Sequence, residues 1–158
     1  MAVPKKLLNE VNKAYGKLQD LKAAIAKARK VGNVKKVKTL MEKAAVQKQK
    51  YVLLNKKYEA MKIVEAKKQE FLAKVKNVLG KQKALQCRIK KLGKMLQKAS
   101  NPHQRIAIRD QITAAKNKLN ILAASRANLL DELKIVDMNM SRFAKNIDIN
   151  IKKLSKVA

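Results

Sequence analysis

The sequence predicts an all-α protein, an elongated antiparallel helical hairpin or coiled coil of three long helices at about 4–30, 33–99 and 102–156. The first observation is composition, since 158 residues include only four glycines and two prolines while 47% are hydrophobic, which favours long helices over many turns. The second is that apolar residues recur in alternating steps of three and four, the heptad pattern of packed helices. We expect residues 1–158 to form a single elongated helical domain.

The first helix is expected to begin at Pro4, because proline suits the first turn of a helix. Its heptad positions are Leu7, Val11, Ala14, Leu18, Leu21, Ile25 and Ala28. Gly32 suits the left-handed conformation that often ends a helix, and Asn33 can cap the helix that follows. A tight turn is therefore predicted at residues 31–33.

The second helix carries the longest heptad pattern in the chain. Its positions are Val34, Val37, Met41, Ala44, Lys48, Tyr51, Leu54, Tyr58, Met61, Val64, Lys68, Phe71, Val75, Val78, Gln82, Leu85, Ile89, Leu92, Leu96 and Ala99. Gly80 and Gly93 lie inside it, and each glycine costs about 1 kcal/mol in a helix interior. Because the pattern stays in register through both, we expect one long helix that bends at Gly80 if anywhere. A full break at Gly80 is the main alternative.

The third helix is expected from Pro102, with Asn101 as its N-cap and Gln104 at the capping-box position. Its heptad positions are Ile108, Ile112, Ala115, Leu119, Leu122, Arg126, Leu129, Leu133, Val136, Met140, Phe143, Ile147, Ile151 and Leu154. Near its end, isoleucines alternate with polar residues, which is also a strand pattern. The longer heptad pattern favours helix for residues 145–151, and a strand is the alternative.

Charge is the main indication of function. The chain has 39 Lys and Arg against 11 Asp and Glu, for a net charge of +28, and such self-repulsion suggests that it works in a complex with a polyanion. Residues 71–109 contain no acidic residue. The expected phosphate-binding residues lie in this stretch and are Lys74, Lys76, Lys81, Lys83, Arg88, Lys90, Lys91, Lys94, Lys98, Arg105 and Arg109.

Lysine outnumbers arginine by 33 to 6, and lysine contacts phosphate as a point charge, whereas arginine reads guanine. The five aromatic residues lie on or beside heptad positions, so we expect them in the helix core rather than stacked on bases. The sequence therefore predicts a structural, largely sequence-nonspecific protein that coats, compacts or packages DNA or RNA in a nucleoid, virion core or ribonucleoprotein. It does not separate DNA from RNA, or a cellular from a viral origin.

The hairpin corner is the place where we expect one phosphate to bind. Arg105 and Arg109 lie in the first turns of the third helix, where the helix dipole is already positive. Lys94 and Lys98 come from the facing helix, and free backbone N–H groups would add donors. We expect His103 to be an exposed residue of this corner.

Two other functions stay open, an anionic-membrane-binding protein and a coiled-coil scaffold for an acidic partner. Membrane binding is less favoured because the chain has no Trp, which surface-seeking helices often expose. With one Cys, Cys87, and one His, and with no catalytic motif, we expect no enzyme activity, metal or cofactor. No signal peptide or membrane span is evident, so we expect a soluble protein inside a cell or virus particle. Because a two-helix core is thin, self-association or a larger assembly is also expected.

Overall fold

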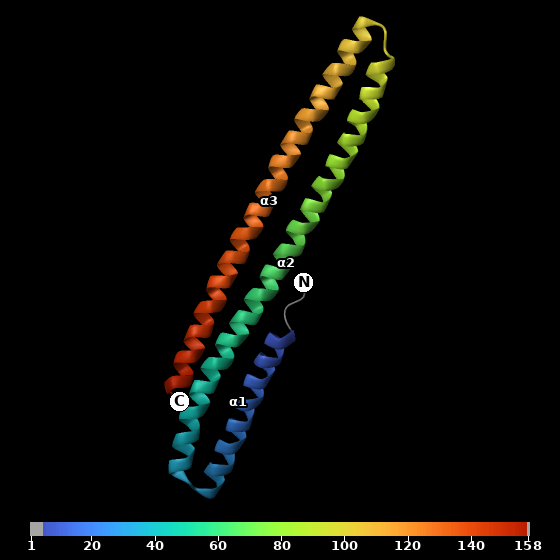
Figure 1. Ribbon diagram of the computed structural model, residues 1–158. Helices are drawn as coiled ribbons and strands as arrows, with labels where there is room; N and C mark the ends of the chain where they lie inside the picture. The colour runs from blue at the N-terminus through green and yellow to red at the C-terminus, as the bar shows by residue number, and fades with distance from the viewer. Residues whose placement is uncertain (1–4, 158) are drawn as a thin grey trace. The chain divides into compact units, whose positions relative to one another are not determined.

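The computed structural model describes residues 5–157, and over this range the chain forms three α-helices and no strand. They are α1 (Lys5–Val31), α2 (Val34–Lys98) and α3 (Pro102–Val157), shown in Figure 1. The predicted all-α class with three long helices is confirmed. The expected start at Pro4 lies outside the described residues, and the other predicted ends lie within one residue of those observed.

Both local alternatives prove wrong. α2 is a continuous helix of 65 residues that includes Gly80 and Gly93, so there is no break at Gly80. Residues 145–151 are helical within α3, where Ile147 is buried. At Gly80, the packing of a long heptad pattern outweighs the glycine, which costs only about 1 kcal/mol in a helix. At residues 145–151, the same kind of packing outweighs the local alternation of isoleucines with polar residues.

The turn between α1 and α2 forms as predicted. Gly32 has a φ of 78°, and its N–H donates to Arg29 O at 3.1 Å while Asn33 N–H donates to Ala28 O at 3.1 Å. These two bonds form a Schellman motif, which satisfies the last carbonyls of α1. The Asn33 side chain then accepts from Lys36 N–H at 3.2 Å and caps α2.

The turn between α2 and α3 also contains the predicted cap. Asn101 Oδ1 accepts from His103 N–H at 2.9 Å, and Pro102 occupies the first helical position. The capping box is not completed, since Gln104 makes no side-chain hydrogen bond to any residue of the described chain. The N-cap therefore rests on Asn101 alone.

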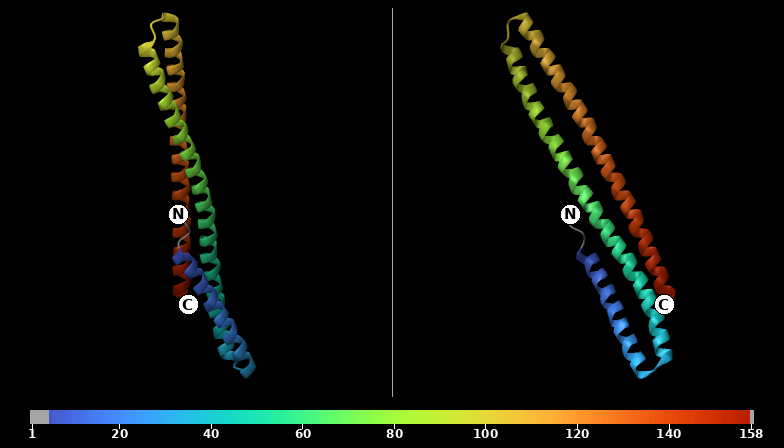
Figure 2. Two further views of the ribbon diagram at one scale, coloured as in Figure 1. Left: turned by 90° about the vertical axis from the view of Figure 1, so that its right-hand side faces the viewer. Right: turned by 180° about the vertical axis from the view of Figure 1, so that it is seen from behind.

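The chain divides into two compact units. Unit 1 comprises residues 1–66 and 136–158, and unit 2 comprises residues 67–135. Within unit 1, α1, the first part of α2 and the last part of α3 run side by side in that order (Figures 1 and 2). Its buried residues are Leu7, Val11, Ala14, Leu18, Ala28 and Ile147.

In unit 1, α2 packs against two helices and carries two patterns of buried positions rather than one. The half-buried positions 40, 44, 47, 51, 54 and 58 include two contacts to α1. Gln47 Nε2 donates to Ala14 O at 3.0 Å, and the Tyr51 ring lies 5.5 Å from that of Tyr15. The half-buried positions 46, 50, 53, 57, 60 and 64 include Lys57, whose Nζ lies 3.0 Å from Asp148 Oδ1 of α3.

This second pattern corrects part of the predicted one. Val34, Met41 and Lys48 were expected in the helix contact but are exposed, as is Phe143, at 40%. Where α2 lies between α1 and α3, its contact positions are split between two faces, and a single heptad line cannot describe both. The remaining predicted positions of α1, α2 and α3 are buried or half-buried.

Unit 2 is a two-helix hairpin made of the last part of α2 and the first part of α3. Its predicted heptad positions are half-buried or buried throughout, and within this unit Leu92, Ile108 and Ala115 are the buried ones. The hairpin thus has a narrow apolar core, while the other sides of both helices are exposed. This exposed surface carries the candidate site.

Candidate nucleic-acid interface

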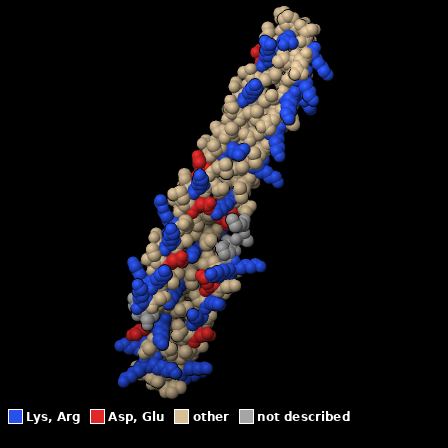
Figure 3. All heavy atoms as spheres, viewed as in Figure 1, with Lys and Arg blue, Asp and Glu red and all other residues tan. Residues whose placement is uncertain are grey.

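The charges of unit 2 are concentrated on α2. Its α2 segment, residues 67–98, has eleven Lys and Arg against one acidic residue, Glu70. Its α3 segment, residues 102–135, has six Lys and Arg against three acidic residues. In Figure 3, Lys and Arg side chains, drawn in blue, line the right-hand edge of the upper part of the view, where Figure 1 shows α2. The two helices of the hairpin therefore present surfaces of very different charge.

Nine of the eleven predicted phosphate-binding residues are exposed cations that form no ion pair with any described residue. We call them the free cations; they are Lys76, Lys81, Lys83, Arg88, Lys90, Lys91, Lys94, Lys98 and Arg109. Eight lie on α2, and Arg109 is on α3. No carboxylate of the described residues competes with an external anion for these groups.

Lys74 is different because it has partners within its own helix. Its Nζ lies 3.7 Å from Glu70 Oε1 and 5.6 Å from the centre of the Phe71 ring. Both charged side chains are more than half exposed, and pairs of this kind contribute only about 0.3–0.5 kcal/mol. Lys74 can therefore exchange Glu70 for an external anion at little cost.

Arg105 has a structural role that the sequence did not reveal. Its Nη1 donates to Ala99 O at 3.0 Å and to Leu96 O at 3.3 Å, and the side chain is half-buried. These carbonyls end α2, where the helix dipole is negative. The bonds to these carbonyls explain why Arg105 lies in the first turn of α3, and no external anion is needed.

The N-terminus of α3 also offers fewer donors than expected. Pro102 has no N–H, His103 N–H is bonded to Asn101 Oδ1, and Arg105 N–H donates to Asn101 O at 3.0 Å. Of the first four residues of α3, only Gln104 keeps an N–H without a partner among the described residues. A phosphate at this corner would depend mainly on Lys94, Lys98 and Arg109, and His103 is exposed as expected.

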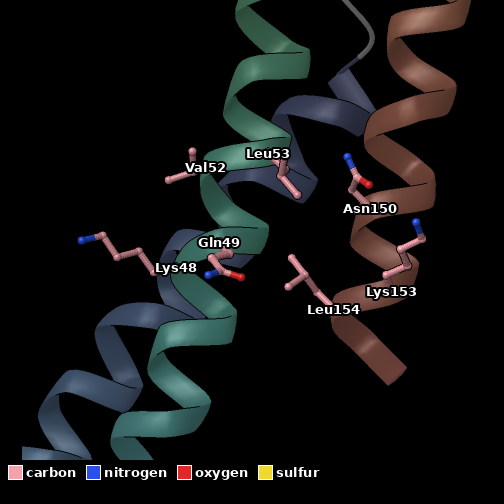
Figure 4. Close-up of a pocket in the computed structure, with 7 residues that line it drawn as sticks. All are labelled: Lys48, Gln49, Val52, Leu53, Asn150, Lys153 and Leu154. Atoms are coloured by element: carbon pink, nitrogen blue, oxygen red, sulfur yellow. The ribbon is translucent and has the colours of Figure 1, made fainter. Parts of the chain in front are cut away.

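Unit 1 contains a groove of about 520 Å³ between α2 and α3, and none of the free cations lines it. Figure 4 shows Leu53 of α2 and Leu154 of α3 pointing toward each other across it, while Lys48 extends away. Val52, Gln49, Asn150 and Lys153 complete its lining. The groove is apolar and open and brings together no acid, base or nucleophile suited to catalysis.

Other kinds of site find no support among the residues that the structure describes. Within residues 5–157 there is no group of three or more His, Cys, Asp and Glu placed to hold a metal ion. None of the described helices is long and apolar enough to cross a membrane. No protein family, curated protein or solved structure matches the chain.

Proposed function

We propose that the chain is a structural nucleic-acid-binding protein that coats, compacts or packages DNA or RNA through lysine–phosphate contacts. The observation that carries this proposal is the set of nine free cations within a stretch that contains no acidic residue. Its lysines supply charge without the bidentate geometry that reads bases, so binding depends little on sequence.

Repulsion between neighbouring cations on α2 lowers the stability of the free protein. Between residues 88 and 98, four pairs of cations stand three or four residues apart on one helix. Each such pair destabilises a helix by about 0.2–0.5 kcal/mol, or about 1–2 kcal/mol together. Binding of a polyanion removes this repulsion, so its binding free energy includes the relief of a strain built into α2.

Contacts to bases contribute little in this proposal. Phe71 is the one Phe, Tyr or Trp in unit 2, and it is half-buried beneath Lys74, so the only exposed ring for base stacking among the described residues of this unit is the imidazole of His103. Stacking on aromatic side chains is what usually anchors single-stranded bases. The expected complex is therefore held by phosphates and is strongly weakened by salt.

A second candidate partner is an anionic membrane surface. The observation that favours it is that Leu72 and Leu79, exposed at 47% and 38%, lie on the same flank of α2 as Lys76 and Lys83. Apolar and basic residues together are typical of helices that lie in a lipid interface. Two leucines are a small apolar surface, so nucleic acid is the better supported partner.

One experiment separates the two candidates. The full chain is titrated with duplex DNA, duplex RNA and vesicles containing anionic lipid, at physiological salt. A variant with Lys83, Lys90 and Lys91 changed to Gln is measured beside a control with the exposed α1 residues Lys13, Lys17 and Lys22 changed to Gln.

Nucleic acid should bind tightly, and the α2 variant should weaken it at least tenfold more than the α1 control. Vesicle binding without nucleic-acid binding would refute the proposal, and so would equal effects of the two variants.

A further inference from the structure

The cations of α2 in unit 2 form two parallel rows. Lys76, Lys83 and Lys90 repeat every seven residues, and Lys74, Lys81 and Arg88 do the same. All six side chains are exposed. Because an α-helix rises about 1.5 Å per residue, each row has a cation about every 10.5 Å.

The strip between the two rows carries small, uncharged side chains. They are Asn77, Gly80, Ala84 and Cys87, and all four are exposed. With about 100° of rotation per residue, each row lies roughly 80° from this strip, one on either side. We call this strip of small side chains the ridge, and the side chains of the two rows extend to either side of it. The ridge faces away from α3, because the half-buried heptad positions lie on the opposite side of α2.

This arrangement fits a groove whose two walls are negative. The major groove of B-DNA is about 12 Å wide, and an α-helix with its side chains is about 10–12 Å across. A helix lying in that groove has a phosphate backbone on each side, where the two rows reach, and base edges in front, where the small ridge permits close approach. A flat anionic surface would instead favour cations on the ridge itself.

We propose that residues 74–90 of α2 lie in the major groove of duplex DNA, with the two cation rows on opposite phosphate backbones. This inference rests on the proposed nucleic-acid binding and goes beyond it by choosing duplex DNA. The segment from Lys74 to Lys90 is about 24 Å long, or about seven base pairs at 3.4 Å each. Beyond that length a straight helix leaves the curving groove.

The residues at the end of the segment agree with that exit. After Cys87, the ridge positions are taken by Lys91, Lys94 and Lys98, all exposed. Where the helix leaves the groove, its ridge crosses a phosphate backbone, and cations are then needed on the ridge itself. The change from small residues to lysines along one face thus marks where groove contacts end and backbone contacts begin.

The geometry also discriminates between nucleic acids. The major groove of A-form RNA is too deep and narrow for such an approach, so an RNA duplex can meet these rows only from outside. Of the four ridge residues, Asn77 has an amide able to hydrogen-bond a base edge, and the Cys87 thiol is only a weak donor or acceptor. Duplex DNA is therefore preferred over duplex RNA, with little dependence on base sequence.

The test measures affinities of the full chain for a DNA duplex, an RNA duplex and a single strand of the same sequence, by fluorescence anisotropy at one salt concentration. The ridge is filled by changing Gly80 and Ala84 to Leu, which leaves every charge in place. A Cβ built at Gly80 meets nothing within 4 Å, so this position accepts a larger side chain. The control changes the exposed α3 residues Ala124 and Ala127 to Leu, and circular dichroism checks that both variants stay helical.

The unchanged protein should bind the DNA duplex at least tenfold tighter than the RNA duplex. The ridge variant should lose at least tenfold for DNA and little for RNA, while the control keeps both affinities. Equal DNA and RNA affinities with no effect of the ridge variant would overturn the groove assignment and leave the proposed function standing. Absence of binding to all three nucleic acids would overturn both.

Discussion

Replacement of Arg105 by Ala should destabilise the protein although the residue belongs to a basic surface. The side chain ties the two helices of unit 2 together at the turn, with Nη1 bonded to Ala99 O and Leu96 O at 3.0 and 3.3 Å. Hydrogen bonds to a charged group contribute about 1.5–3 kcal/mol each when well formed. Because Arg105 is half-buried and water can reach the helix end, we expect about 2 kcal/mol for the two together.

The matched control is Arg109, one turn further along α3, which is exposed and whose side chain bonds to no described residue. Its change to Ala should alter the free energy of unfolding by less than about 0.5 kcal/mol, as for most surface substitutions. Urea unfolding followed by circular dichroism compares the two variants. For a chain of this length, about 2 kcal/mol corresponds to a melting temperature lower by about 4–8 °C.

A lysine at position 105 keeps the charge beside the end of α2 but offers a single-point donor, so Arg105→Lys should recover part of the loss. If Arg105→Ala and Arg109→Ala lower stability equally, the capping role of Arg105 is refuted. An external anion would then be needed to explain why a cation lies in the first turn of α3, where the helix dipole is positive.

Further predictions concern the glycines and the hairpin corner. Gly80→Ala should stabilise the helix by about 1 kcal/mol, because the site is open and alanine is the better helix former; a loss of stability in thermal unfolding would contradict this. Gly32→Ala should destabilise by about 1–2 kcal/mol, because φ is 78° there and the left-handed region is unfavourable for alanine; an unchanged melting temperature would be inconsistent with that turn. Reversing the charges of Lys94 and Arg109 should weaken nucleic-acid binding at least tenfold, as measured by filter binding, whereas equal weakening on reversing Lys13 and Lys17 would remove the special role of the corner.

The helices and their turns were predictable because the signals for them are local. Heptad spacing places the buried positions, Gly32 and Asn33 determine one turn, and Asn101 with Pro102 determines the other. Each of these features depends on residues a few positions apart. Local chemistry was therefore enough to place the helix ends within one residue wherever the structure describes them.

The two faces of α2 in unit 1 were missed in part because polar residues occupy three of the contact positions, 47, 50 and 57. Gln47 and Lys57 look like surface residues in the sequence, yet one donates to Ala14 O and the other pairs with Asp148. Their partners lie 33 and 91 residues away, so no local pattern identifies them. The available signal was Val46 and Leu53, two apolar residues that lie off the predicted heptad line and are half-buried.

The expected site residues were predictable in their exposure but not in their individual roles. Charge patterning located the acid-free stretch, and nine of its eleven cations are exposed and pair with no carboxylate within residues 5–157. Arg105 was assigned to an anion because a cation at a helix N-terminus is unfavourable taken alone. The carbonyls that it contacts belong to the preceding helix, so their position becomes apparent only once the hairpin is closed.

The salt dependence of duplex binding tests the central claim most directly, because it counts the phosphates that the free cations neutralise. If most of the nine free cations each contact one phosphate, log K should fall with log salt with a slope of about −5 to −8, at −0.9 per contact. The α2 variant with Lys83, Lys90 and Lys91 changed to Gln should lower the magnitude of that slope by about three. A slope near −2 or smaller in magnitude, unchanged in this variant, would contradict phosphate binding by α2.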